Sequence, residues 1–323
     1  VENTPTISST PTPESPKTQW DNLSSNTRLN RLAVKDYPKF ADFDRQKEVT
    51  LATAQSYCHE THCNQSPDEM ARAVIFLNEN DFTMEHVKEL TQRGLTMKEI
   101  EEEKKSTLAI TATNRNIYIN ESYKDRLVDI NKNVPEIVAL LNGQDFETIF
   151  EISIIAHELA HRNSIEQTIT FDGFSIKLPN TNDRIIFNTL NKFKIEGRDS
   201  TDKPYFIMGG DEAITDLAAR IIIEKKVGLD YLLAPEYMQG GLLVEKLNKM
   251  AGISDEEFLD YANGTLPAED LLKEWGKFKK NSSLTDLKAG ILALRDIGLA
   301  LDGIINFQDA ETDINRILKL ENQ

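Results

Sequence analysis

Residues 152–164 read ISIIAHELAHRNS and contain His157, Glu158 and His161 in the order His-Glu-x-x-His. On a helix, His157 and His161 are one turn apart and project from the same face. Two imidazoles at this spacing can occupy two corners of a tetrahedral Zn²⁺ site. Glu158 lies about 100° further round the helix, where its carboxylate can reach a water molecule on the metal. The stretch therefore predicts a metal-binding helix that carries its own base.

The apolar residues of the same stretch also follow a helical period. Ile152, Ile155, Ala156 and Leu159 stand at positions i, i+3, i+4 and i+7, which places them together on the face opposite the histidines. We expect this face to pack in a core while the other face meets the metal.

Two histidines leave a zinc site one protein ligand short of a catalytic site that keeps a position open for water. The other histidines, His59, His62 and His86, all precede the motif, and Gln167 stands six residues after it, where some sites have a third histidine. The third ligand is therefore expected to be a carboxylate on a later helix.

Glu212 is the best candidate for this third ligand. It stands at an expected helix start, directly after the Gly209-Gly210 bend, which lets the backbone approach a neighbour closely. Asp216 follows four residues later on the same helix face. A carboxylate behind a ligand imidazole fixes its tautomer and raises its basicity.

Residues 157–161 and 209–216 together resemble the gluzincin metallopeptidases, the thermolysin-like zinc peptidases, whose motif helix is followed by a second helix with a Glu-Ala-x-x-x-Asp-like run. The resemblance implies that His157, His161 and Glu212 bind Zn²⁺, that Glu158 is the general base, and that Asp216 accepts a hydrogen bond from a ligand histidine. The preceding strands match more loosely. The connection between the two stretches is much longer than in thermolysin-like enzymes, so the subfamily and the substrate stay open.

The activity that this resemblance implies is zinc-dependent hydrolysis of peptide bonds in a protein or peptide substrate, most simply by an endopeptidase. Zincins hold an extended substrate along a strand edge, and residues 117–120 or their hairpin partner are candidates for that edge. An oxyanion donor is also expected, and Tyr205, Tyr231 and Tyr237 are all possible.

Composition narrows the class of partners. The chain has 323 residues and a net charge of −16, which argues against nucleic acid and anionic lipid as partners, because both need a basic protein surface. Hydrophobic residues make up 39% and charged residues 28%, as in an ordinary globular protein. No stretch reaches the ~18 uninterrupted apolar residues of a membrane span.

The two cysteines, Cys58 and Cys63, stand close together in the run SYCHETHCNQ. This spacing favours one disulfide in an oxidising compartment. Two reduced thiols are an alternative, and so is a second metal site that adds His59 and His62, although four ligands from one six-residue run rarely close a tetrahedron.

The fold predicted is a predominantly helical α+β protein with a zincin-like core, a small sheet and flanking helical regions. Residues 1–19 are rich in Thr, Ser and Pro and are expected to be a disordered tether, which suits an exported bacterial protein. We expect a helical region at 20–107, the catalytic core at 108–227 and a second helical region at 228–323.

Several local signals specify elements within these regions. Ser66-Pro67-Asp68-Glu69 is a helix start with a capping box. The runs LAITAT and IYIN after Leu108 predict two short strands, and Asp172-Gly173 between alternating runs predicts a hairpin turn. Residues 180–203 are expected to form a polar loop.

Three alternatives to an exported peptidase remain. A reduced cysteine pair would favour an intracellular regulatory protease. A disordered N-terminus also suits an effector protease delivered into host cells. The third is a catalytically inactive binding or scaffold protein on a zincin fold, which the presence of both histidines, the base and a third ligand disfavours.

Overall fold

The computed structural model describes residues 45–61, 63, 65–92, 97, 100, 107–122, 146–164, 167–177, 184–227 and 235–319. The chain divides into two compact units. The described residues up to 164, with 218–227, belong to one unit, which we call the motif unit. Residues 167–217 and 235–319 belong to the other, which we call the C-terminal unit. The core predicted at 108–227 is thus divided between both units, and the predicted tether at 1–19 lies outside the described residues.

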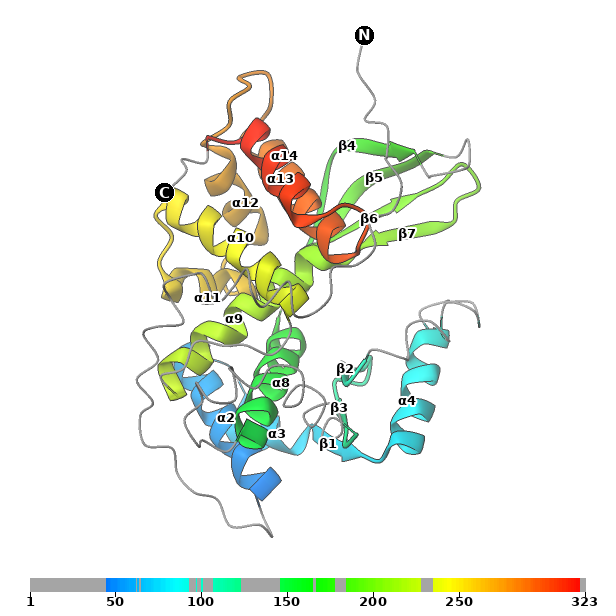
Figure 1. Cartoon of the computed structure of the whole chain (residues 1–323), viewed down its shortest axis with the longest axis vertical. Helices are drawn as coiled ribbons and strands as arrows, with labels where there is room; N and C mark the ends of the chain where they lie inside the picture. The colour runs from blue at the N-terminus through cyan, green and yellow to red at the C-terminus, as the bar shows by residue number, and fades with distance from the viewer. Residues whose placement is uncertain are drawn as a thin grey trace. The chain divides into compact units, whose positions relative to one another are not determined.

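The predicted predominantly helical α+β class is confirmed (Figure 1). In the motif unit the elements are α2 (Arg45–Thr61), α3 (Pro67–Arg72), β1 (Val74–Leu77), α4 (Glu79–Gln92), β2 (Ala109–Thr111), β3 (Ile117–Asn120) and α8 (Phe146–Asn163). The described helices include none that is long and apolar enough to cross a membrane.

The helix start predicted at Ser66 is present. The Ser66 hydroxyl accepts a hydrogen bond from the Glu69 backbone N–H, and the Glu69 side chain accepts one from the Ser66 backbone N–H, which completes a capping box with Pro67 at the first helical position. This cap begins α3 and delivers the chain into β1. The region predicted as mostly helical also contains a strand, which the sequence did not reveal because the apolar run Val74–Leu77 is too short for its period to separate strand from buried helix.

The small sheet of the motif unit has the order β1-β3-β2, with β1 parallel and β2 antiparallel to β3. Helix α4 packs on it through Phe82, which joins Ala112 and Tyr118 in a common apolar cluster. The strands β2 and β3 also lie against α8. Since β3 is the central strand, it cannot offer a free edge to a substrate, whereas its hairpin partner β2 lies at the edge of this sheet as far as the described strands go.

The C-terminal unit contains a second sheet, an antiparallel meander of β4 (Thr168–Lys177), β5 (Arg184–Asn191), β6 (Lys194–Arg198) and β7 (Pro204–Ile207). The expected polar loop at 180–203 is therefore wrong. Ile185 and Phe187 on β5 and Ile195 on β6 are buried, while their neighbours in sequence are exposed or half-buried. The alternation is weak in the sequence because Ile186, which lies between Ile185 and Phe187, is apolar although its side chain is exposed.

The predicted hairpin at Asp172-Gly173 is also wrong, because β4 runs straight through these residues. The register of β4 against β5 shifts between Thr170 and Phe174, so Asp172-Gly173 forms a bulge in one strand. A Cβ atom added at Gly173 would lie 2.7 Å from the Phe187 backbone oxygen, so glycine is required by close approach to β5 and not by a turn. The true connection to β5 comes after Lys177.

The described helices of the C-terminal unit are α9 (Gly209–Val227), α10 (Pro235–Ala251), α11 (Asp255–Asn263), α12 (Ala268–Gly276), α13 (Asp286–Leu301) and α14 (Phe307–Ile317). Helix α9 belongs to this unit up to Leu217 and to the motif unit after it. Helix α13 is buried along its length and packs against α10, α12, α14 and β7. Ser254, Thr285 and Asn306 cap α11, α13 and α14 with side-chain oxygens.

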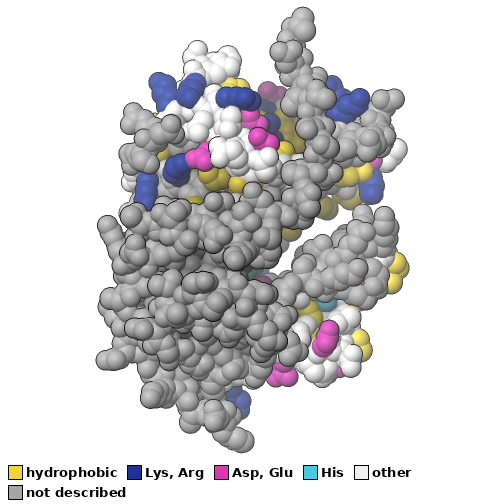
Figure 2. Space-filling model, viewed as in Figure 1, with side chains coloured by type: hydrophobic (Ala, Val, Ile, Leu, Met, Phe, Trp, Pro, Cys, Tyr) yellow, Lys and Arg dark blue, Asp and Glu magenta, His cyan; other side chains and the backbone are white. Residues whose placement is uncertain are grey.

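The described surface carries charges of both signs, as Figure 2 shows for the side of the molecule drawn there. Two large apolar side chains are also exposed on the meander, Ile186 at 57% and Phe206 at 44%. The Lys194 ammonium lies over the Phe206 ring, 4.9 Å from its centre, in a cation–π contact.

Cys58, near the end of α2, is joined to Cys63 by a disulfide. The disulfide therefore joins the end of α2 to the connection that precedes α3, and both sulfur atoms lie close to the Met70 sulfur on α3. The oxidised pair cannot supply thiolates to the alternative metal site, whose His59 side chain is 83% exposed and whose His62 lies outside the described residues.

We expect free-thiol titration of the unreduced, denatured protein to find no reactive thiol. The ring is small, so the disulfide should contribute on the order of 2 kcal/mol to the free energy of unfolding. Two reactive thiols per chain would contradict the bond and favour the reduced alternative.

The bulge at Gly173 predicts a local cost for any side chain there. Gly173→Ala should lower the free energy of unfolding by about 1–3 kcal/mol, because the added methyl group must displace β5 backbone. Denaturant unfolding measures this, with Ser175→Ala at an exposed position of the same strand as the control. Equal stability of the two variants would mean that β5 yields freely at this point.

Candidate metal centre

Helix α8 carries His157, Glu158 and His161 in the motif unit. The opposite face is buried as predicted, with Ile152 at 3% exposure and Ile155, Ala156 and Leu159 at 0%. Burial of this face fixes the rotation of the helix and turns both histidines to the other side. Their Nε2 atoms lie 3.1 Å apart, and the rings meet edge to face at 76°.

The C-terminal end of α8 is tied to loops of the same unit by Arg162. Its Nε donates to the Arg115 backbone oxygen at 2.7 Å, and its Nη1 donates to the Gln65 side-chain oxygen at 2.5 Å. Burial lowers the pKa of the Arg162 guanidinium, and the nearby charge of Arg115 lowers it further. These bonds fix the last turn of the helix, next to His161.

Glu158 is 6% exposed. The Thr111 hydroxyl on β2 lies 2.8 Å from Glu158 Oε2 and 3.1 Å from the Glu158 backbone oxygen. The Glu158 carboxylate is therefore held inside the motif unit by a strand of the small sheet.

Glu212 stands in the first turn of α9. The backbone N–H groups of Met208 and Gly209 both donate to the Asp302 carboxylate, at 3.2 and 3.0 Å. A carboxylate here satisfies donors that the helix itself leaves open, and it complements the positive end of the helix dipole. Asp302, directly after α13, therefore caps the helix that carries Glu212.

The Gly209-Gly210 pair lets α9 approach α13 closely. A Cβ atom at Gly209 would lie 2.5 Å from Leu301 Cβ and 2.6 Å from the Gly298 backbone oxygen. Gly298 is equally constrained, because a Cβ there would lie 2.5 Å from an Ile207 methyl group. The close backbone approach predicted for the glycine pair is thus made to another helix of the same unit, and it fixes where the first turn of α9 begins.

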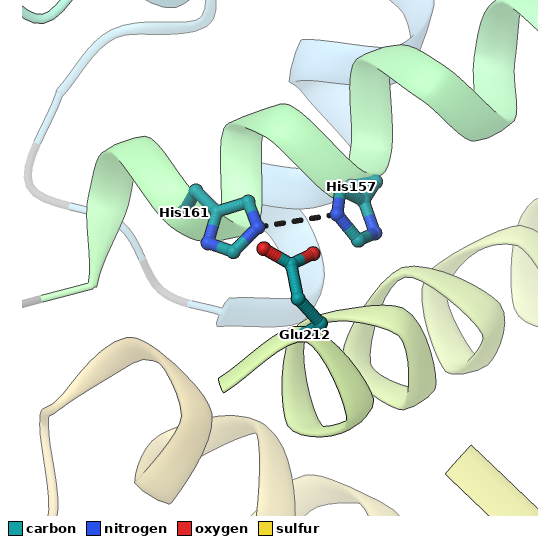
Figure 3. Close-up of side chains that lie close together, drawn as sticks. All are labelled: His157, His161 and Glu212. Carbon is teal, nitrogen blue, oxygen red and sulfur yellow. Dashed lines mark hydrogen bonds between the residues drawn. The ribbon is translucent and has the colours of Figure 1, made fainter. Parts of the chain in front are cut away.

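His157, His161 and Glu212 form a group whose ligand atoms all lie within 4.8 Å of one another, and this group could hold a metal ion (Figure 3). Figure 3 shows the Glu212 carboxylate pointing at the two imidazole rings. In a tetrahedral zinc site, two histidine nitrogens are about 3.3 Å apart, close to the 3.1 Å between the Nε2 atoms. Two imidazoles and one carboxylate are also a donor set that leaves a fourth position open.

The remaining candidates are placed less closely. Asp216 lies one turn after Glu212 on α9 and is completely buried, and its bond to a ligand histidine stays a prediction. Tyr205 is half-buried on β7 with the Lys203 ammonium 5.3 Å from its ring centre. Tyr231 and the Tyr237 side chain lie outside what the structure describes, so the oxyanion donor stays open.

Thr111 and Asp302 are two residues of the centre that sequence reasoning did not single out. Thr111 is one of several β-branched residues in a short strand, and Asp302 is one acid among many at the end of a helix. Neither position has a local signal, because each partner is remote in the sequence. Only the folded chain brings the pairs together.

Comparisons of the chain with protein-family models, with curated proteins and with solved structures found no match. The argument for function therefore depends on the residues of the site itself.

We expect Glu212→Ala to lower metal affinity sharply, because it removes one of three protein ligands. Asp216→Ala should have a smaller effect, about 10–100-fold, as is usual for a residue that orients a ligand. Asp211→Ala is the matched control, since it removes a neighbouring acid of the same turn that is outside the ligand group. Chelator competition with Zn²⁺ or Co²⁺ measures all three affinities. If Glu212→Ala bound metal as tightly as the parent, another residue would have to be the third ligand.

Proposed function

We propose that this protein is a zinc-dependent peptidase of the gluzincin type, with His157, His161 and Glu212 as metal ligands and Glu158 as general base. The observation that carries the proposal is the convergence of the Glu212 carboxylate on the two motif histidines, from a helix remote in the sequence. If the His-Glu-x-x-His sequence had arisen by chance, no third ligand would be expected close to its histidines in the folded chain.

The donor set favours zinc. Two histidines and one glutamate, with a fourth position left for water, are typical of catalytic zinc sites in peptidases. When bound, Zn²⁺ would lower the pKa of a water molecule and polarise the carbonyl group of a substrate.

The chemical steps assigned to the chain are proton transfers by Glu158. Its carboxylate removes a proton from the attacking water and delivers it to the amine that leaves. A buried carboxylate suits this role, since its surroundings exclude most competing water. The reaction consumes one water and divides one peptide bond into an acid and an amine.

The edge strand β2 is the proposed support for an extended substrate. Asn120 donates its backbone N–H to Leu108 O, and Ala112 donates its own to Asn116 O, so the backbone groups of alternate residues point toward β3. The backbone groups of Ala109 and Thr111, which lie between, therefore face away from β3. A peptide paired along this edge would bind mainly through its backbone, which suits a protein or peptide substrate.

The disulfide between Cys58 and Cys63 supports an exported protein, because such bonds persist in oxidising compartments. We therefore propose an extracytoplasmic peptidase in preference to the intracellular alternative.

The decisive variant is Glu158→Gln. It removes the base but no ligand, so metal content should stay at the parent level while turnover of a peptide-library substrate falls by several orders of magnitude, on the order of 10⁴-fold. Metal analysis and the digest are made on the same preparations. Parent-level cleavage by Glu158→Gln would refute the mechanism, and a parent that binds metal but cleaves nothing would favour the binding or scaffold alternative.

A further inference from the structure

Strand β2 places one side chain directly on the proposed base. Thr111 Oγ lies 2.8 Å from Glu158 Oε2 and 3.1 Å from the Glu158 backbone oxygen. A hydroxyl has one proton to donate. Hydrogen bonds to an ionised acceptor are shorter and stronger than those to a neutral one, so the carboxylate is the main acceptor.

This contact restricts the Glu158 side chain more than packing alone would. A glutamate side chain has three rotatable bonds, and a hydrogen bond at its end restricts them beyond the restriction that burial imposes. Thr111 is itself stiff, because it is β-branched and stands in a strand paired with Ile117 on β3. With Oε2 held by Thr111, Oε1 is the oxygen we assign to the proton of the attacking water.

We propose that Thr111 is a positioning residue for Glu158, which holds the carboxylate in one orientation for proton transfer. This inference rests on the proposed peptidase function. It adds a second role to β2: the residue whose backbone lies on the proposed substrate edge also fixes the base through its side chain. A substrate paired along β2 would therefore restrict the motion of the same strand whose Thr111 side chain holds Glu158.

A structural role for Thr111 makes a different prediction. A clamp between β2 and α8 needs only the bond to the helix carbonyl, and its loss would lower stability and metal affinity together. A positioning role instead lowers kcat and leaves KM and metal affinity near the parent values.

The test compares three variants under conditions where all are folded. Thr111→Val keeps the shape of the side chain and removes the hydroxyl, and kcat should fall about 10–100-fold, the effect expected of a misplaced catalytic group. Thr111→Ser restores the hydroxyl and should recover most of kcat. KM and the affinity for Zn²⁺ should stay within about 2-fold of the parent in both, because neither side chain is a ligand.

Thr113→Val is the matched control. It removes a hydroxyl two residues further along the same hairpin, where the acceptor is the buried Glu89 carboxylate of α4 and not Glu158. Its kcat should stay near the parent value. A parent-level kcat in Thr111→Val, or equal losses in Thr111→Val, Thr111→Ser and Thr113→Val, would overturn the proposal.

A measurement without turnover separates this inference from the peptidase itself. In the metal-free protein with ¹³C-labelled glutamate, the Glu158 carboxyl resonance is identified by its absence from Glu158→Gln. It should move in Thr111→Val and return toward its parent position in Thr111→Ser. An inactive parent would refute the peptidase, and an unmoved resonance in Thr111→Val would refute the hold on Glu158.

Discussion

The motif unit depends on the burial of the apolar face of α8. Ile155, Ala156 and Leu159 are completely buried on one side, and loss of that burial would cost roughly 1.5–3 kcal/mol for each large side chain. Burial of this face fixes the rotation of α8 about its axis, so His157 and His161 project from the opposite face. The hydrophobic core therefore sets the direction of both histidine side chains, whose Nε2 atoms lie 3.1 Å apart. Two ring nitrogens this close are favourable only where a proton or a cation lies between them.

The position of Glu212, the proposed third ligand, depends on a different constraint, the close approach of α9 to α13. Gly209 and Gly298 remove the side chains that would keep the two backbones apart, and Asp302 then accepts hydrogen bonds from the first N–H groups of α9. A helix whose first turn is fixed at both its backbone and its cap holds Glu212 on a rigid element. Metal sites built from such elements need little reorganisation to bind.

The meander of the C-terminal unit is coupled to α13 through its bulge. Lys288 donates to the backbone oxygens of Asp172 and Gly173, and its ammonium also lies 5.5 Å from the centre of the Phe171 ring. Burial lowers the pKa of Lys288, and Arg295 adds to this effect. In a regular strand these two carbonyl oxygens would bond within the sheet, whereas at the bulge they accept hydrogen bonds from Lys288 of α13. These bonds connect the buried helix to β4.

The sequence by itself determined the parts of this protein whose signals are local. The motif spacing placed both histidines and Glu158 on one helix, the apolar period gave the buried face of that helix, and Ser66 with Glu69 gave the start of α3. The glycine pair followed by Glu212 and Asp216 also predicted that α9 begins there and carries the candidate carboxylates. Each of these features depends on residues within about two helical turns of one another, so the sequence alone contains the interactions that cause it.

Only the tertiary structure decided what depends on remote partners. The Asp172-Gly173 pair has the sequence of a turn, but the neighbouring strand makes it a bulge, because glycine satisfies both situations and only the position of Phe187 separates them. The strands at 184–198 have a weak alternation that becomes decisive only when the sheet buries one face. Thr111 and Asp302 gain their roles from residues 47 and 93 positions away. Hydrogen bonds across such separations leave no periodic trace in a single chain, so folding alone brings these residues to the candidate site.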